Sequence, residues 1–231
     1  MTDLVTVVDQ DTHVLIAMDD GKANALGFDM FAALNAALDQ AEAAGKCIVL
    51  AGRPGRFSAG FDLTVMARQD ADTLRLLRSG ADLALRLFDA SVPVVGAVSG
   101  HAIAMGALLC LSVDYRVGAA GDFKLGLNEV EIGMTLPWFG VELARARLAN
   151  EWIGRAVDLA TLFDPERATQ VGYLDEVVEA ERLTDRAGEV AAAFARLNMT
   201  AFAETKARTR EPARKALQHA LERDFAMASA S

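Results

Sequence analysis

The amino-acid sequence predicts an α/β protein with a largely parallel sheet. Short apolar runs at 47–50 and 92–98 alternate with segments of helical spacing at 28–44 and 74–88, the pattern of strands joined by crossover helices. Both runs are apolar nearly throughout, as strands covered on both faces are. The chain has 231 residues, 52% hydrophobic and 24% charged, which suits one globular domain or one domain with a small appendage.

The N-terminal half supplies most of the expected sheet. Leu4–Val8 and Val14–Met18 are rich in β-branched residues on either side of a polar turn, which predicts a hairpin. Large apolar residues recur every three or four positions along Phe28–Ala44, so we expect a helix there that Gly45 ends. Cys47–Leu50 follows as the first inner strand.

The alternation continues along the chain. A second amphipathic helix, from Leu74 to Phe88, precedes an inner strand at Val92–Val98. Ala102–Leu111 is apolar nearly all round and predicts a buried helix. Val113–Val117 is a further candidate strand.

Helical patterns dominate after Gly140. They occur at Val141–Leu148, Arg182–Leu197 and Glu211–Ala226, and Leu174–Val178 is the remaining strand candidate. This part predicts a helical appendage rather than a second core.

Composition narrows the class of function. A net charge of −9 argues against a nucleic-acid partner. Cys47 and Cys110 each lie in an apolar run, which predicts buried free thiols in a reducing compartment. The N-terminus lacks the pattern of a signal peptide, and no apolar stretch reaches the roughly 20 residues of a membrane span. We therefore expect a cytoplasmic protein that does not contact a membrane.

Several common kinds of site are absent from the sequence. The histidines at 13, 101 and 219 are far apart and have no ligand at metal-binding spacing, so no metal is expected. Neither Ser58 nor Ser99 lies in a Gly-x-Ser-x-Gly elbow. No glycine-rich phosphate loop follows a strand, which weakens a nucleotide-cofactor interpretation.

Two loops follow predicted inner strands and are rich in small residues. Residues 52–63 come after Cys47–Ala51, and residues 99–107 come after Val92–Val98. Open α/β sheets bind ligands at the carboxyl ends of their strands, and the first N–H groups of a helix have no partner within it. Two such loops suit a pair of backbone donors, the geometry of an oxyanion hole. Either loop alone is equally consistent with a simple tight turn.

The residues of these loops resemble the signatures of the crotonase superfamily, the enoyl-CoA hydratases and isomerases. The resemblance runs in order across most of the chain. The segments that carry it are Asn24-Ala25-Leu26, Ala51–Leu63 with Phe-Ser-Ala-Gly-Phe-Asp-Leu, Ala97–Asp114, Leu127–Gly133 with Pro137, and Ala168–Val178.

The resemblance implies a spiral core of β-β-α turns over residues 1–180. It implies a C-terminal helical region, 181–231, that forms a homotrimer or a dimer of trimers. The implied ligand is an acyl-CoA thioester, bound as substrate with no separate cofactor. Lys206, in a Thr-Lys-Ala frame, is a candidate contact to a CoA phosphate.

The resemblance also implies the site residues. The thioester oxygen accepts hydrogen bonds from two backbone N–H groups, which align with Ala59 and Met105. The residues implied to line the substrate are Ala25, Ala59, Gly60, Phe61, Asp62, Leu63, Met105, Leu108 and Trp138.

The pair of positions 108 and 129 discriminates between reactions. Hydratases of the family use two glutamates, and this chain has Leu108 at one position and Glu129 at the other. Hydration needs an activated water and a delivered proton, whereas moving a double bond from C3 to C2 needs one carboxylate that shuttles a proton. The prediction is an enoyl-CoA isomerase with Glu129 as that carboxylate.

Two alternatives stay open. One is a hydratase in which His101, Glu131 or Asp62 assists Glu129. The other is a crotonase that binds acyl-CoA without chemistry, which the apolar Leu108 and Met105 would suit and Glu129 argues against.

Overall fold

A computed structural model describes residues 3–226 of the chain. Its centre is a six-stranded sheet in the order β1-β2-β4-β7-β9-β11. The strands are β1 Val5–Asp9, β2 His13–Met18, β4 Cys47–Ala51, β7 Val94–Val98, β9 Tyr115–Ala119 and β11 Glu176–Val178. The hairpin β1–β2 is antiparallel and every other neighbouring pair is parallel. The predicted α/β class with a largely parallel sheet is confirmed.

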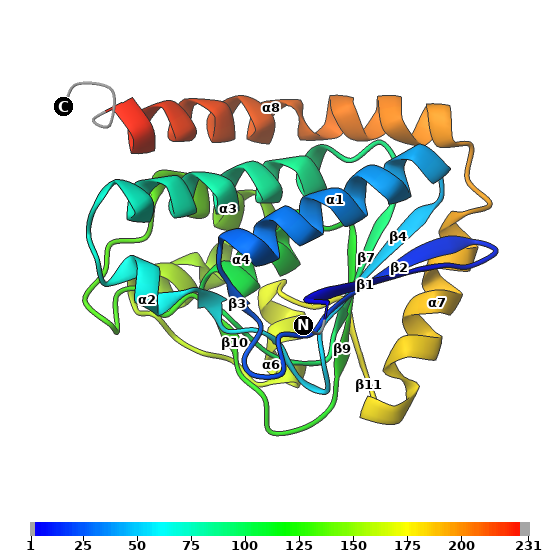
Figure 1. Ribbon diagram of the computed structural model, residues 1–231, viewed down its shortest axis with the longest axis horizontal. Coiled ribbons are helices and arrows are strands. Elements are labelled where there is room, and N and C mark those ends of the chain that lie inside the picture. Colours follow the sequence, from blue (N-terminus) through cyan, green and yellow to red (C-terminus); the bar gives the residue numbers. More distant parts are fainter. Residues whose placement is uncertain (1–2, 227–231) are drawn as a thin grey trace.

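Helices cover both faces of this sheet (Figure 1). The helices of the described residues are α1 Phe28–Ala44, α2 Leu63–Met66, α3 Ala71–Asp89, α4 Met105–Ser112, α5 Trp138–Arg147, α6 Pro165–Val171, α7 Leu183–Phe194 and α8 Met199–Phe225. Shorter helical turns lie at Asn150–Trp152, Gly154–Asp158 and Ala180–Arg182.

Alternate residues of the inner strands enter two separate cores. Ile48 and Leu50 of β4 join the core formed with α1, α3 and α4. Cys47 and Val49 face the other way, onto Leu183, Ala187, Val190 and Ala191 of α7. Strands buried on both faces explain the continuous apolar runs in the sequence. Figure 1 shows α7 on the side of the sheet opposite α1, α3 and α4.

Two small sheets lie beside the main one and hold the predicted site loops. The first has the order β10-β8-β5, with β5 Gly55–Ser58, β8 Gly100–Ile103 and β10 Leu125–Gly126, all parallel. The second pairs β3 Ala25–Leu26 with β6 Gly60–Phe61, also parallel. The chain therefore alternates between the central sheet and this flanking layer, since β4 is followed by β5 and β6, and β7 is followed by β8.

The small strands correct two expectations. The helix predicted over 102–111 begins at Met105, because residues 100–103 pair with β5 and β10 as β8. The loop predicted over 52–63 contains β5 and β6. Such strands are stabilised by distant partners rather than by their own residue pattern, so local periodicity does not show them.

Two helices after residue 137 begin earlier than predicted, whereas α7, predicted over 182–197, is shorter and covers Leu183–Phe194. Helix α5 begins at Trp138 rather than Val141, because the Asp224 carboxylate accepts the N–H groups of Trp138 and Phe139 at 2.8 and 2.9 Å. Helix α8 begins after the Asn198 cap and continues through Pro212. The predicted start at Glu211 is therefore wrong. A strong cap and packing against α5 and α3 outweigh one interior proline.

Within residues 3–226, no helix combines the length and apolar character needed to cross a membrane.

Candidate active site

Three parallel strands of the flanking layer end at one edge, and the segments that follow them form the candidate site. Leu125 and Gly126 of β10 pair with Ala102 and Ile103 of β8, which in turn pairs with β5. The chain leaves these strands toward residues 59–61, toward Met105 and toward Glu129. The topology thus brings together the loops that the sequence analysis singled out.

Asn24 anchors the first of these loops. Its side chain is buried, and its amide Nδ2 donates to the carbonyls of Met18, Arg56 and Phe57 at 3.0–3.3 Å. Ser58 Oγ donates to the Asn24 carbonyl at 2.8 Å and accepts the Gly60 N–H at 3.1 Å. These largely buried hydrogen bonds hold the backbone from 56 to 60 in place.

The Ala59 N–H is engaged within the fold. It donates to the carbonyl of Ala23 at 3.0 Å. This is evidence against Ala59 as one of the two oxyanion donors, the role that the resemblance assigned to it. Asp62 is likewise occupied, since its side chain accepts the Thr64 N–H at 2.8 Å and caps α2. Leu63, on α2, is 69% exposed.

Gly60 brings the first loop against the start of α4. A Cβ on Gly60 would lie 3.0 Å from the Ala104 Cβ and 3.3 Å from the Met105 nitrogen. The φ of Gly60 is +93°, a conformation that glycine adopts at low cost. Ala25 pairs with Gly60 across the β3–β6 ladder. Ala25, Gly60, Phe61 and Met105 are therefore neighbours.

The turn into α4 is strained. Ala104 has φ +52° and ψ −121°, a region that non-glycine residues seldom occupy. Its N–H donates to the Gly126 carbonyl at 3.0 Å, which ties the turn to β10. Met105 is the first residue of α4, so its N–H has no intrahelical carbonyl to donate to. Strained residues of this kind cluster at functional sites.

Glu129 follows β10 by three residues and is buried. Its exposure is 9%, and Oε2 has no hydrogen-bond partner. Burial raises the pKa of this carboxyl from 4.5 to about 7, against a smaller lowering by its own backbone N–H. The next turn is closed by the Met134 N–H, which donates to the Glu129 carbonyl at 2.8 Å. A carboxyl that titrates near neutral pH suits transfer of a proton in either direction.

In the part of the chain that the structure describes, Glu129 is the one acidic residue that is buried. Glu131 is exposed. Asp62 caps α2, and His101 accepts the Lys124 N–H through Nδ1 at 3.1 Å and stacks edge-on against Phe123. The candidate partners that a hydratase would need are thus exposed or engaged elsewhere.

The surroundings of Leu108 are apolar. Leu108 is 1% exposed on α4, and a Cβ on Gly140 would touch both it and Leu136, at 3.4 and 3.0 Å. Leu136 also lines a groove of about 390 Å³ with Trp138 and Phe225. Trp138 is 42% exposed there, and the Arg223 guanidinium lies 3.4 Å from its ring centroid. An apolar wall therefore extends from Leu108 toward this groove.

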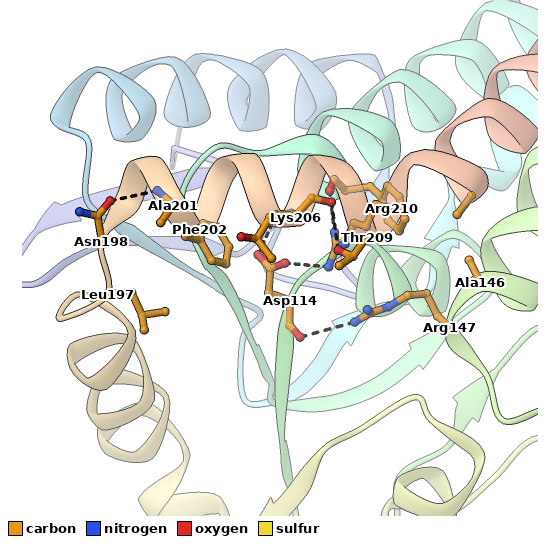
Figure 2. Close-up of a pocket in the computed structure, with 13 residues that line it drawn as sticks. Asp114, Ala146, Arg147, Leu197, Asn198, Ala201, Phe202, Lys206, Thr209 and Arg210 are labelled. Carbon is orange, nitrogen blue, oxygen red and sulfur yellow. Dashed lines mark hydrogen bonds and ion pairs between the residues drawn. The ribbon is translucent and has the colours of Figure 1, made fainter.

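Lys206 belongs to a different cavity, of about 660 Å³, between α8 and the end of α5 (Figure 2). Its Nζ lies 2.9 Å from Asp114 Oδ2, and Arg210 lies 2.7 Å from Oδ1 of the same carboxylate. Lys206 is 7% exposed. Its charge stabilises the docking of α8, which argues against the predicted contact with a CoA phosphate. No cluster of three or more metal-ligating side chains occurs within residues 3–226.

A family model described as enoyl-CoA hydratase/isomerase matches residues 9–231. The chain belongs to this family. The solved structures that resemble it agree with this assignment, and they confirm the crotonase fold. An enoyl-CoA hydratase/isomerase family protein from Pseudomonas syringae has a TM-score of 0.94 at 43% identity, over 96% of this chain and 97% of that one.

Relatives within the family are described as isomerases and as hydratases. A Mycobacterium tuberculosis protein, described as an enoyl-CoA isomerase in one solved structure and as a probable enoyl-CoA hydratase in another, has a TM-score of 0.93 at 41% identity in the first, over 98% of this chain and 99% of that one. An enoyl-CoA hydratase from Mycobacterium marinum has the same TM-score and identity, over 96% and 98%. The human mitochondrial enoyl-CoA delta isomerase 1 is 35% identical over 142 residues, 61% of this chain. The chain spans about half the length of the curated relatives it matches.

Proposed function

We propose that this protein is an enoyl-CoA isomerase that moves a C3 double bond of an acyl-CoA thioester to C2. The observation that carries the proposal is Glu129, the one buried carboxylate among residues 3–226, together with an apolar residue, Leu108, where a second acid would be needed for hydration. Isomerisation needs one group that removes and returns a proton. The human enoyl-CoA delta isomerase among its relatives supports the same reaction.

The proposed oxyanion donors are the N–H groups of Phe61 and Met105. Asp62 donates to Leu26 across the β3–β6 pair at 3.2 Å. In a parallel pair one residue bonds to the neighbours of its partner on either side. In the Leu26–Phe61 pair that residue is Leu26, so the N–H of Phe61 is not directed at β3. Gly60, next to it, places this backbone against the Met105 nitrogen. Phe61 therefore replaces Ala59 in the proposal.

The proposed reaction needs no cofactor beyond the CoA thioester itself. The Glu129 carboxylate removes a proton from C2, and the electron pair of that C–H bond becomes part of a dienolate. Its negative charge is on the thioester oxygen, where two backbone donors stabilise it. The protonated Glu129 then returns the proton at C4, which leaves the double bond between C2 and C3.

Hydration is less well supported. It requires a positioned water and a second acid or base, and Leu108 supplies neither. The loss of one such group costs about 100- to 10,000-fold in rate.

A homotrimer or a dimer of trimers is part of the proposal. Val130, Ile132 and Leu159 are 49%, 51% and 72% exposed, and Val130 and Leu159 line one surface groove. Exposed apolar groups of this kind are typical of subunit contacts. Light scattering coupled to gel filtration should give three or six times the mass of the chain, and a monomer mass would refute the assembly.

The function is tested by paired assays on the purified protein. One supplies a 3-enoyl-CoA and follows its conversion to the 2-enoyl-CoA, and the other supplies a 2-enoyl-CoA and follows hydration. Turnover in the first assay alone, lost in Glu129→Gln and kept in the neighbouring exposed variant Glu131→Gln, is the expected result. Fast hydration would support a hydratase. Acyl-CoA binding with no turnover in either assay would support the binding protein.

A further inference from the structure

Tyr173 is a wholly buried tyrosine whose hydroxyl has no hydrogen-bond partner. Its exposure is 0%, and it is among the largest fully buried side chains of the described residues. The sequence pattern treats this position as simply apolar, and a phenylalanine or leucine would satisfy it. Buried polar groups without partners are rare because desolvation is costly, so this hydroxyl requires an explanation.

The fold directs Tyr173 to the base of the candidate site. Helix α6 ends at Gly172, whose φ of +106° turns the chain inward, and the Tyr173 N–H donates back to Ala168 at 2.9 Å. The Tyr173 ring packs on Phe163, with centroids 6.2 Å apart. Phe163 exchanges two backbone hydrogen bonds of 2.9 Å with Leu125 of β10. The Tyr173 ring therefore packs on a side chain whose backbone is paired with β10, the strand that precedes Glu129.

Glu129 is the charged group with the largest electrostatic effect on this hydroxyl. Burial raises the pKa of Tyr173, the negative charge of Glu129 raises it further, and the backbone of Leu127 acts in the opposite sense. Cys110 of α4 is the other titratable neighbour, and burial raises its pKa to about 12. Around Tyr173, only Glu129 therefore changes its charge near neutral pH.

The two orphaned atoms are complementary. Glu129 Oε2 is a buried acceptor without a donor, and Tyr173 has a buried O–H without an acceptor. They are not bonded to one another in the structure, so a hydrogen bond between them would require a rotation of the carboxylate or one bridging water. Buried waters commonly join such groups.

We propose that Tyr173 is a positioning residue, whose hydroxyl donates to the Glu129 carboxylate and favours its ionised, proton-accepting form. This inference rests on the proposed function for the catalytic role of Glu129. The physical need is clear, since an apolar surrounding alone favours the neutral acid. A donor beside Oε2 limits that effect and keeps the carboxylate available as a base, and it also fixes the orientation of the carboxylate.

The test compares Tyr173→Phe with Tyr115→Phe. Tyr115 is the other tyrosine of the chain. It lies on β9, stacks on Phe194 and faces Glu176, away from Glu129. Both variants remove one hydroxyl and keep the ring. The titration of Glu129 is followed without substrate, by the infrared carboxyl band that is present in the wild type and missing in Glu129→Gln.

In Tyr173→Phe we expect the midpoint of this band to rise by about half to one pH unit, the equivalent of one ordinary hydrogen bond. The acidic limb of kcat/KM for the 3-enoyl-CoA should move by the same amount. Tyr115→Phe should leave both unchanged. An unmoved midpoint in a folded Tyr173→Phe would overturn the proposal. The infrared titration needs no turnover. Its result therefore tests the role of Tyr173 even if the protein proves not to be an isomerase.

Discussion

Replacing Glu129 by glutamine should change how the free energy of unfolding depends on pH. In the unfolded chain this carboxyl loses its proton near 4.5, and in the folded protein it retains the proton to about 7. Between these values the folded state binds more protons than the unfolded state. Stability therefore falls as the pH rises through this window, and it is independent of this group below 4.5.

The size of the effect follows from the rise in pKa. A change from 4.5 to about 7, at about 1.4 kcal/mol per pKa unit, corresponds to about 3 kcal/mol. Glutamine has a similar shape and no charge to desolvate. As the pH rises from 4.5 to 8, the free energy of unfolding of Glu129→Gln should therefore increase by about 3 kcal/mol relative to that of the wild type. Any difference between the two proteins that is constant with pH adds to this.

Urea unfolding at several pH values, followed by tryptophan fluorescence, measures this difference. Glu131→Gln is the matched control, because Glu131 is exposed two residues away and its substitution should give no pH-dependent gain. A constant difference between Glu129→Gln and the wild type across the whole range would refute the reasoning, since the carboxyl would then titrate alike in both states.

Three further predictions concern the backbone and the ion pairs. Ala104→Gly should raise the free energy of unfolding by about 1 kcal/mol in urea titrations, because it removes strain at φ +52°. Gly60→Ala should lower it by about 1–3 kcal/mol and reduce turnover of the 3-enoyl-CoA, because its Cβ would press on Ala104 at 3.0 Å. Asp114→Asn should lower the free energy of unfolding by about 3–5 kcal/mol in the same titration, because Lys206 and Arg210 lose a shared counter-ion whose side chain is only 13% exposed, with kcat per folded site unchanged.

Sequence periodicity predicted the elements whose burial pattern is local. Helix α1 covers the predicted 28–44, and Gly45 ends it in the left-handed conformation with φ +64°. The inner strands β4 and β7 lie within or at the edge of the predicted apolar runs. In these segments one face or both faces are buried along the whole element, so the residue types report the structure directly.

The geometry of the site was harder to predict because it depends on distant pairings. The motif around Ala59 identified the correct loop, but which N–H points away from β3 is decided by the register of Leu26 against Phe61. The left-handed backbone at Ala104 could not be predicted from the sequence, because alanine does not indicate a positive φ as glycine does. Tyr173 satisfies an apolar pattern, and only the tertiary structure shows that its hydroxyl is buried without a hydrogen-bond partner.

The same burial that destabilises the Glu129 carboxylate assists the proposed reaction. When Glu129 accepts the C2 proton it becomes neutral, which its apolar surroundings favour. The negative charge passes to the thioester oxygen, where the proposed donors, the N–H groups of Met105 and Phe61, would stabilise it. The charge thus moves from a place where the fold disfavours it to one where the fold favours it. The strain at Ala104, of about 1–3 kcal/mol, is consistent with this arrangement, because that turn begins α4 at Met105, whose N–H has no acceptor within the helix.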